Sequence, residues 1–173
     1  GDTLLCRRFL QTYATGITGD GLFMDSWPAS DRVTRLAHRQ IGLTFWGNIV
    51  DHSVQFVFDC YKYYVSTGDL ECLRAPMKAL DKLAAFLADT CKEGLYPTDN
   101  RNSGFVWLDH DAYSWTDHRI KECAINLYIA GMLENAYIPL CRAFGRSREE
   151  TGCFAALARR LVRLVTEKYP VVW

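Results

Sequence analysis

Residues 54–87, VQFVFDCYKYYVSTGDLECLRAPMKALDKLAAFL, contain the periodic pattern that decides the fold. Apolar side chains recur at positions 54, 57, 58, 61, 64 and 65, which is the spacing of one face of an α-helix. Gly68 follows this pattern as a helix-ending glycine would. A second helical pattern continues to near Gly94 and runs through Leu73, Met77, Leu80, Ala84 and Leu87. The stretch therefore predicts a helical hairpin that turns at Gly68.

Helical patterns continue on both sides of this hairpin. Residues 3–14 (TLLCRRFLQTYA) predict a helix. Residues 24–50 predict a long irregular loop, because they contain Trp27-Pro28 and two glycines. A last helix is expected over residues 154–165, stopping before Pro170.

The longest helical pattern runs from Ile120 to Phe144 and stops at Gly145. Pro139 is expected to kink this helix, because its ring clashes with the carbonyl four residues earlier. No strand pattern of comparable length occurs, so the predicted fold class is all-α. A chain of 173 residues is long enough for one domain, which buries roughly 70% of its unfolded surface.

The two predicted hairpins, which turn at Gly68 and Gly145, share a register. A shift of 77 residues places Met77 on Phe154, Leu80 on Leu157, Ala84 on Leu161 and Leu87 on Leu164. Repeated hairpins with long loops on alternate connections are typical of an αα-toroid, whose loops build a pocket at one end. The competing plan is a solenoid of short helical repeats, but a period of about 34 or 40 residues is absent.

Composition excludes several classes of partner. The chain has 20 basic and 20 acidic residues, so it carries no electrostatic footprint for nucleic acid. Its apolar runs are too short to span a membrane. No signal peptide is visible, but the sequence starts with Gly1-Asp2 rather than Met, so this absence excludes no compartment. The seven cysteines are odd in number and include no CxxC. Buried free thiols explain them best, which favours a reducing compartment, cytoplasmic rather than periplasmic.

The candidate site is the segment Phe105–His118, FVWLDHDAYSWTDH, between two helical patterns. It carries two Asp-His pairs, Asp109-His110 and Asp117-His118, together with several aromatic residues. Aromatic rings can stack on a pyranose while carboxylates accept hydrogen bonds from its hydroxyls. The segment therefore predicts a sugar pocket. The alternative is a structural loop whose tryptophans cap the core.

Within this segment Asp109 is the first choice for a substrate contact, with a structural cap as the alternative. His110, the next residue in the sequence, is a further candidate for substrate binding. Trp107 and Trp115 are candidates for stacking on sugar, although one of them is expected in the core.

Further candidates lie before the first hairpin. Asp25 and Trp27, on the glycine-rich loop, could form another wall of the pocket. The pair Asp51-His52 is the third Asp-His pair of the chain. Because the helix is expected to start near Ser53, N-capping by Asp51 competes with ligand binding, and His52 could be a packing histidine.

Neither a metal nor an organic cofactor is expected. His110, Asp111 and His118 have suitable donor atoms, but their eight-residue spacing matches no closed zinc pattern. Nucleophilic catalysis by a cysteine has no supporting feature beyond the presence of Cys and His.

Several segments taken together resemble six-hairpin glycoside hydrolases, in particular bacterial α-L-rhamnosidase catalytic domains. IVDHSVQFVFDCYKYYVSTGDLECLR resembles their second hairpin, with its Tyr-x-x-Thr-Gly-Asp turn, and DGLFMDSWPA resembles a loop that precedes it. VWLDH resembles their Phe-Ile-Asp-Trp element, and CAINLYIAGMLENAYIPLCRAFG the Ala-Leu-Asn helix that follows. The likeness covers nearly the whole chain in the same order. Val50, Phe56 and His110 depart from the family's usual residues, which leaves the identity of the sugar open.

The resemblance implies that residues 1–173 are roughly half of an (α/α)6 toroid, truncated at both ends. It places the general acid upstream of Gly1, in a motif ending in Gly-Asp, and the general base downstream of Trp173. Inversion requires both groups, at about 6.5–9.5 Å from one another. The chain alone is therefore expected to contribute part of the pocket without catalysing hydrolysis.

The implied partners are a rhamnoside or related carbohydrate, the rest of the parent chain, and a second copy through exposed hairpin flanks; nucleic acid and membrane are not expected. The alternative function is a non-enzymatic helical module that binds carbohydrate or a protein partner through the aromatic loop.

Overall fold

The computed structural model describes residues 2–19, 21–23, 49–98, 106 and 118–170, and for residues 118–120 it describes the backbone alone. About 78% of these residues are helical and none lies in a strand. An isolated antiparallel bridge joins Ile17 to Phe23. The predicted all-α class is confirmed.

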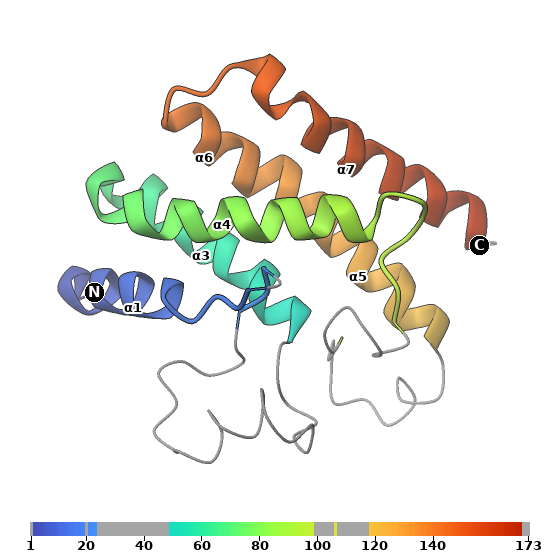
Figure 1. Ribbon diagram of the computed structural model, residues 1–173, viewed down its shortest axis with the longest axis horizontal. Helices are drawn as coiled ribbons and strands as arrows, with labels where there is room; N and C mark the ends of the chain where they lie inside the picture. Colours follow the sequence, from blue (N-terminus) through green and yellow to red (C-terminus); the bar gives the residue numbers. More distant parts are fainter. Residues whose placement is uncertain (1, 20, 24–48, 99–105, 107–117, 171–173) are drawn as a thin grey trace, which may run out of the picture.

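The helices follow the predicted hairpins (Figure 1). Their bounds are α1 Thr3–Ala14, α3 Val50–Thr67, α4 Leu70–Thr90, α5 His118–Met132, the π-helical turn η2 Leu133–Tyr137, α6 Ile138–Ala143 and α7 Arg148–Lys168. One hairpin joins α3 to α4 at Gly68, and the other joins α6 to α7 at Gly145.

The turn of the first hairpin is fixed by local hydrogen bonds. Gly68 has a φ of 67°, a left-handed conformation that glycine adopts without the strain of a Cβ. Asp69 then caps α4, since its carboxylate accepts the amide hydrogen of Cys72 at 3.0 Å. The Tyr63 hydroxyl donates to the other carboxylate oxygen of Asp69 at 2.8 Å. Gly68 and Asp69 of the Tyr-x-x-Thr-Gly-Asp segment therefore have structural roles.

The second hairpin starts α7 earlier than the apolar pattern predicts. Ser147 accepts the amide hydrogen of Glu150 at 3.2 Å, and the Glu150 carboxylate accepts the amide hydrogen of Ser147 at 2.7 Å. This reciprocal capping box begins the helix at Arg148, before its first apolar residue, Phe154.

The expected effect of Pro139 takes the form of a π-helical turn. The amide of Ile138 donates to the carbonyl of Leu133, five residues earlier, at the end of η2. Proline cannot donate a backbone hydrogen bond, and its ring crowds the preceding turn. A wider turn relieves that crowding, and the chain continues as α6.

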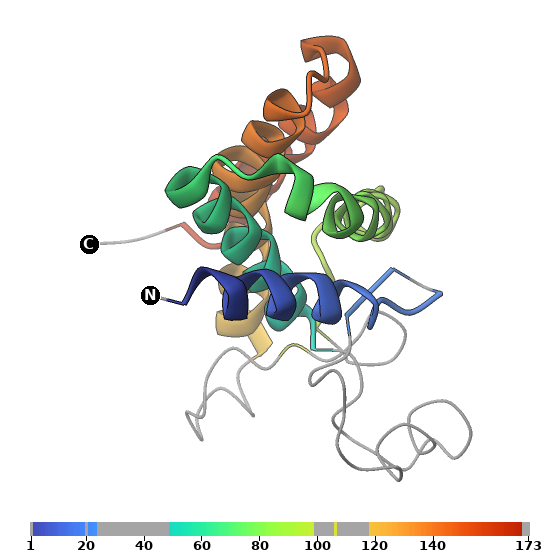
Figure 2. The same cartoon turned by 90° about the vertical axis from the view of Figure 1, so that its left-hand side faces the viewer.

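Two sets of helices pack against each other. α3 lies beside α5, η2 and α6, whereas α4 packs between α1 and α7. Figures 1 and 2 show that α3 and α5 start on the same side of the molecule and run toward the two hairpin turns. α1 runs antiparallel to α3, because Arg7 meets Asp69 beyond the end of α3 at 3.5 Å while Tyr13 packs on Phe56 near its start.

One apolar core joins these helices. Its largest fully buried side chains come from every layer and include Phe23, Phe56, Leu80, Ile129 and Tyr137. Burying an apolar side chain of this size contributes about 1.5–3 kcal/mol. All seven cysteines are free, as expected, but Cys6 and Cys153 are exposed, so the prediction of buried thiols fails for these two.

Candidate functional site

The first turns of α3 and α5 each place a charged residue in a buried position. Asp51, in the first turn of α3, is 8% exposed, and Lys121, in the first turn of α5, is 4% exposed. Burial lowers the pKa of Lys121, while the negative charge of Asp51 opposes that shift. Such charges are costly to place in a protein interior unless they are compensated.

Lys121 also contacts the predicted aromatic segment. Its ammonium group donates to the carbonyl oxygen of Val106 at 3.4 Å. Val106 is fully buried and lies within the segment Phe105–His118, of which the structure otherwise describes only the backbone of His118. The buried Lys121 side chain is therefore next to the backbone of this segment.

The other long segment is attached at the same end. The backbone amide of Phe23 donates to the hydroxyl of Ser53 at 3.0 Å, and that hydroxyl donates to the carbonyl of Ile49 at 3.1 Å. Ser53 thus binds the residues on both sides of positions 24–48. The Phe23 ring packs on Tyr13 and Phe56, at centroid distances of 5.5 and 4.8 Å, which fixes the same point from the core side.

A buried asparagine holds the segment that follows α4. The Asn126 side chain accepts the amide hydrogen of Tyr96 at 2.7 Å and donates to the carbonyl of Tyr96 at 3.2 Å. It also donates to the carbonyl of Glu122, one turn earlier in α5. Both backbone groups of Tyr96 are satisfied in this way, as buried polar groups require. Asn126 is the asparagine of the Ala-Ile-Asn motif, and its role here is structural.

Further along α3 and α5, polar contacts join the two helices. The Tyr128 hydroxyl donates to the side-chain carbonyl of Gln55, and the Gln55 amide donates to Asp59 at 2.9 Å. The Tyr128 ring stacks on Phe58 at 5.6 Å. Burial and the charges of Asp51 and Asp59 raise the pKa of Tyr128, so its hydroxyl remains a donor at neutral pH.

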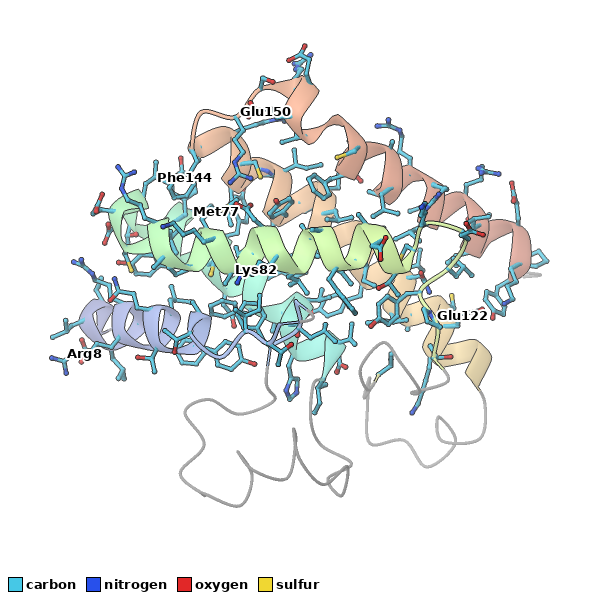
Figure 3. All side chains as sticks on the ribbon, viewed as in Figure 1. Arg8, Met77, Lys82, Glu122, Phe144 and Glu150 are labelled. Atoms are coloured by element: carbon cyan, nitrogen blue, oxygen red, sulfur yellow. The ribbon has the colours of Figure 1, made fainter. Side chains whose placement is uncertain are left out.

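The end of α7 reaches the same region. Glu122, half-buried in α5, accepts hydrogen bonds from the ammonium group of Lys168 at 2.6 Å and from the Tyr169 hydroxyl. Figure 3 labels Glu122 near the start of α5, far from Phe144 and Glu150 at the hairpin turn. An open groove of about 470 Å³ lies here, between the segment after α4 and α7. We call the whole region, where α3 and α5 begin, the loop end.

Two of the site residues proposed from the sequence, Asp51 and His52, lie at the loop end. The helix starts at Val50, with Ile49 as its cap residue, so Asp51 is inside the first turn and the N-capping alternative is wrong. His52 is exposed, so it is not a packing histidine. The other proposed site residues lie outside the described ranges: Asp25, Trp27, Trp107, Asp109, His110 and Trp115.

Two residues of the loop end were missed in the sequence. Lys121 and Asn126 lie on a helix that is predicted from its apolar pattern and from its likeness to the Ala-Leu-Asn helix, neither of which gives these two side chains a role. The available signal was that Lys121 and Asn126 stand beside apolar positions of that pattern, Ile120 and Leu127.

No group of His, Cys, Asp and Glu that could hold a metal occurs within the described part of the chain. Among the same residues, no helix is long and apolar enough to cross a membrane.

Comparisons with protein-family models, curated proteins and solved structures found no significant match to this chain in any of the three. The resemblance to α-L-rhamnosidases therefore rests on the sequence motifs alone.

Proposed function

We propose that the loop end forms part of the sugar-binding pocket of a glycoside hydrolase catalytic domain similar to the inverting α-L-rhamnosidases. In this proposal the two hairpins and α1 are consecutive parts of an (α/α)6 toroid. The order of the helices supports it, because α3 and α5 lie side by side in one layer and α4 and α7 in the other. The observation that carries the proposal is that the described residues bordering both long segments are held by the first turns of α3 and α5.

Both segments that the sequence assigns to sugar binding are attached at this end. Ser53 binds Phe23 and Ile49, on either side of the segment with Asp25 and Trp27. Lys121 binds Val106, which directly precedes Trp107 in the sequence. A pocket built from loops on a rigid helical scaffold is a common arrangement for binding sites.

The chemistry of the described residues suits hydroxyl recognition. The Asp51 carboxylate offers acceptors for sugar hydroxyls, and its negative charge acts on Lys121 in the first turn of α5. His52 is exposed beside them and can donate or accept a hydrogen bond. In this proposal these residues bind and orient the sugar. The resemblance places the general acid and base in other segments, so no proton-transfer step is assigned to them.

The first test is calorimetric titration of the chain with L-rhamnose. We expect binding that weakens by about 1–3 kcal/mol in Asp109→Asn and in Asp51→Asn, the usual contribution of a hydrogen bond to a charged group. Asp59→Asn is the matched control, because Asp59 lies two turns further along α3 and asparagine can still accept the bond from Gln55. Circular dichroism checks that each variant is folded.

Two results would count against the proposal. The sugar site is wrong if L-rhamnose and related sugars do not bind, or if Asp59→Asn weakens binding as much as the other two variants. The second result is measurable hydrolysis of an aryl rhamnoside by the chain alone. We expect no turnover of aryl rhamnosides by the 173-residue chain. Binding by a longer parent that also fails to hydrolyse would favour the non-enzymatic carbohydrate-binding module.

A further inference from the structure

An open groove lies between α4 and the turn that joins α6 to α7. It encloses about 450 Å³, and its lining includes Met77 from α4 and Phe144 from the end of α6. Both are labelled in Figure 3, on the side of the hairpin turns. The lining comes from both hairpins of this chain, so the groove lies between them and not on an outer flank. Further hairpins of a larger toroid would pack on the flanks and leave this groove open.

The charged side chains in the groove are mostly positive. Arg74 and Lys78 come from α4, one helical turn apart, and Arg146 comes from the turn after α6. Asp81 supplies a carboxylate. Three cations and one carboxylate among these lining residues leave an excess of two positive charges. Like charges one turn apart on a helix are unfavourable by themselves, so the stability of α4 does not explain them.

Arg146 binds Asp81 with one edge of its guanidinium group and leaves a second edge open. Nη1 and Nη2 donate to the two carboxylate oxygens at 2.7 and 2.6 Å, and Nη1 also lies 3.5 Å from the Tyr137 hydroxyl and the Cys141 Sγ. A guanidinium group has five N–H donors. Within the described residues, the Nε hydrogen and the second Nη2 hydrogen donate to no acceptor. These two N–H groups are parallel and form a fork that matches two oxygens of an oxyanion.

The bond to Asp81 holds this open fork in a fixed orientation. Asp81 is itself fixed, because its carboxylate also accepts the Tyr137 hydroxyl at 2.8 Å. The Arg146 side chain is 31% exposed and lines the groove, so a ligand can reach it. A fixed donor group loses less conformational entropy on binding than a free one.

The other two cations of the groove are available to a ligand. Lys78 is exposed and forms no hydrogen bond or ion pair within the described part of the chain. Arg74 bonds Glu71, but these side chains are 68% and 75% exposed, and Glu71 does not line the groove. Exposed ion pairs contribute little, so Arg74 can turn from Glu71 to a bound anion.

Charge and size together indicate the class of ligand. A phosphate monoester carries about −1.5 to −2 charges at pH 7, which matches the excess of two positive charges, and its oxygens fit the open fork of Arg146. The groove has room for more than a phosphate group. Met77 and Phe144 offer apolar contacts to the organic part of such a molecule.

We propose that the groove between α4 and the turn after α6 binds the phosphate monoester group of an organic molecule. Arg146 binds two of the phosphate oxygens, Lys78 binds a third, and Phe144 contacts the organic part. This inference depends on the hairpin turns and not on the loop end, so it and the proposed sugar site can fail separately.

The experiment is calorimetric titration of the chain with phenyl phosphate at constant ionic strength. One molecule is expected to bind per chain. Lys78→Gln should raise the Kd at least about tenfold, because a hydrogen bond between charged groups is lost. Lys82→Gln is the matched control, since Lys82 is also exposed on α4, one turn further along, and does not line the groove.

Arg146→Lys separates the fork from simple charge attraction. Lysine keeps the positive charge but has no planar pair of N–H donors, so this variant should also raise the Kd at least about tenfold. Circular dichroism establishes that each variant is folded. Benzoate, which has one negative charge and the same ring, should bind at least about tenfold more weakly than phenyl phosphate.

Vesicles that contain phosphatidic acid distinguish two sources of the same group. Saturable binding of phenyl phosphate assigns the site to soluble organic phosphates. Binding to the vesicles alone, lost in Lys78→Gln and in Arg146→Lys, assigns it to a lipid headgroup.

Three outcomes would overturn the proposal. The first is no saturable binding of either phenyl phosphate or the vesicles. The second is an equal loss of affinity in Lys82→Gln and Lys78→Gln, or no loss in Arg146→Lys, since either result indicates attraction by surface charge alone. The third is a chain that binds benzoate as tightly as phenyl phosphate.

Discussion

The two ends of the helical bundle differ in the polar residues that hold their connecting segments. At the hairpin turns, Gly68 and Gly145 reverse the chain with φ values of 67° and 81°, and exposed or half-buried polar groups cap the next helix. At the loop end the polar groups are buried. Of the buried polar residues described, Thr151 lies near a hairpin turn, and the rest belong to α3, α5 or the segment after α4: Asp51, Ser53, Thr98, Lys121 and Asn126.

This difference indicates that the loop end has a role beyond folding. The turns demonstrate that this sequence can join two helices with a few exposed caps. Buried polar groups are unfavourable unless each finds a partner, so a fold has no need to concentrate them at one end. At the loop end they bind the backbone of Phe23, Tyr96 and Val106, at the borders of the long segments. We infer that they position those segments.

The largest expected effect comes from removing the buried asparagine of the loop end. Asn126→Ala leaves the amide and carbonyl of Tyr96 without these partners in a buried place, and we expect a loss of about 3–4 kcal/mol in the free energy of unfolding. Asn135→Ala, in the same helical stretch but exposed, should change it by about 0.5 kcal/mol or less. Urea denaturation measures both. Equal losses of stability in the two variants would contradict the expected difference between a buried and an exposed asparagine.

Substitution of one glycine near each end compares the two ends directly. A Cβ on Gly21 would lie 2.7 Å from the Cβ of Phe86 and 2.9 Å from the carbonyl oxygen of Lys82, whereas nothing lies within 4 Å of one on Gly68. Both have positive φ. Gly21→Ala should therefore destabilise by about 2–3 kcal/mol, and Gly68→Ala by about 1 kcal/mol. Thermal unfolding gives the order, and a larger effect at Gly68 would contradict the close packing at Gly21.

Near the hairpin turns, Asp81 and Arg146 form an ion pair with two hydrogen bonds, and Asp81→Ala tests its contribution to stability. Arg146 binds both carboxylate oxygens of Asp81, at 2.7 and 2.6 Å, and the Tyr137 hydroxyl donates to one of them at 2.8 Å. These side chains are 31% and 36% exposed, so we expect a loss of about 1–2 kcal/mol. Glu71→Ala removes the more exposed pair with Arg74 and should be nearly neutral by the same denaturation measurement. Similar losses in both variants would show that partial burial of Asp81 adds nothing.

The smallest effect is a pH dependence at the loop end. The pKa of Lys121 lies below its usual value of 10.5 in the folded chain, so the folded state binds fewer protons than the unfolded state as pH rises toward that value. The free energy of unfolding must then rise with pH through this window. We expect the wild-type chain to gain stability relative to Lys121→Met between neutral pH and 10.5. A constant difference across these pH values would mean that Lys121 is not desolvated.

Most of the fold could be predicted from the sequence because apolar periodicity reports which face of a helix is buried. The hairpins at Gly68 and Gly145 follow from it directly. Helix starts were less predictable, because caps and polar first turns carry no apolar signal. This is why α3 begins at Val50 rather than near Ser53, and why α7 begins before Phe154.

The candidate site was less predictable than the fold. The Asp51-His52 pair was identified from residue type, and the structure describes it at the loop end. Asp51, however, acts electrostatically on Lys121, and 70 positions separate the two in the sequence. No local pattern can reveal an interaction between the first turns of two helices in different hairpins. Only the packing of α3 on α5 brings them together.

The central claim is that the loop end binds sugar, and backbone NMR of the chain titrated with L-rhamnose tests it most directly. We predict chemical-shift changes at Asp51, Val106 and Lys121, with Gly68 and Gly145 at the hairpin turns unchanged. Changes concentrated at the turns, or no saturable change anywhere, would contradict the claim.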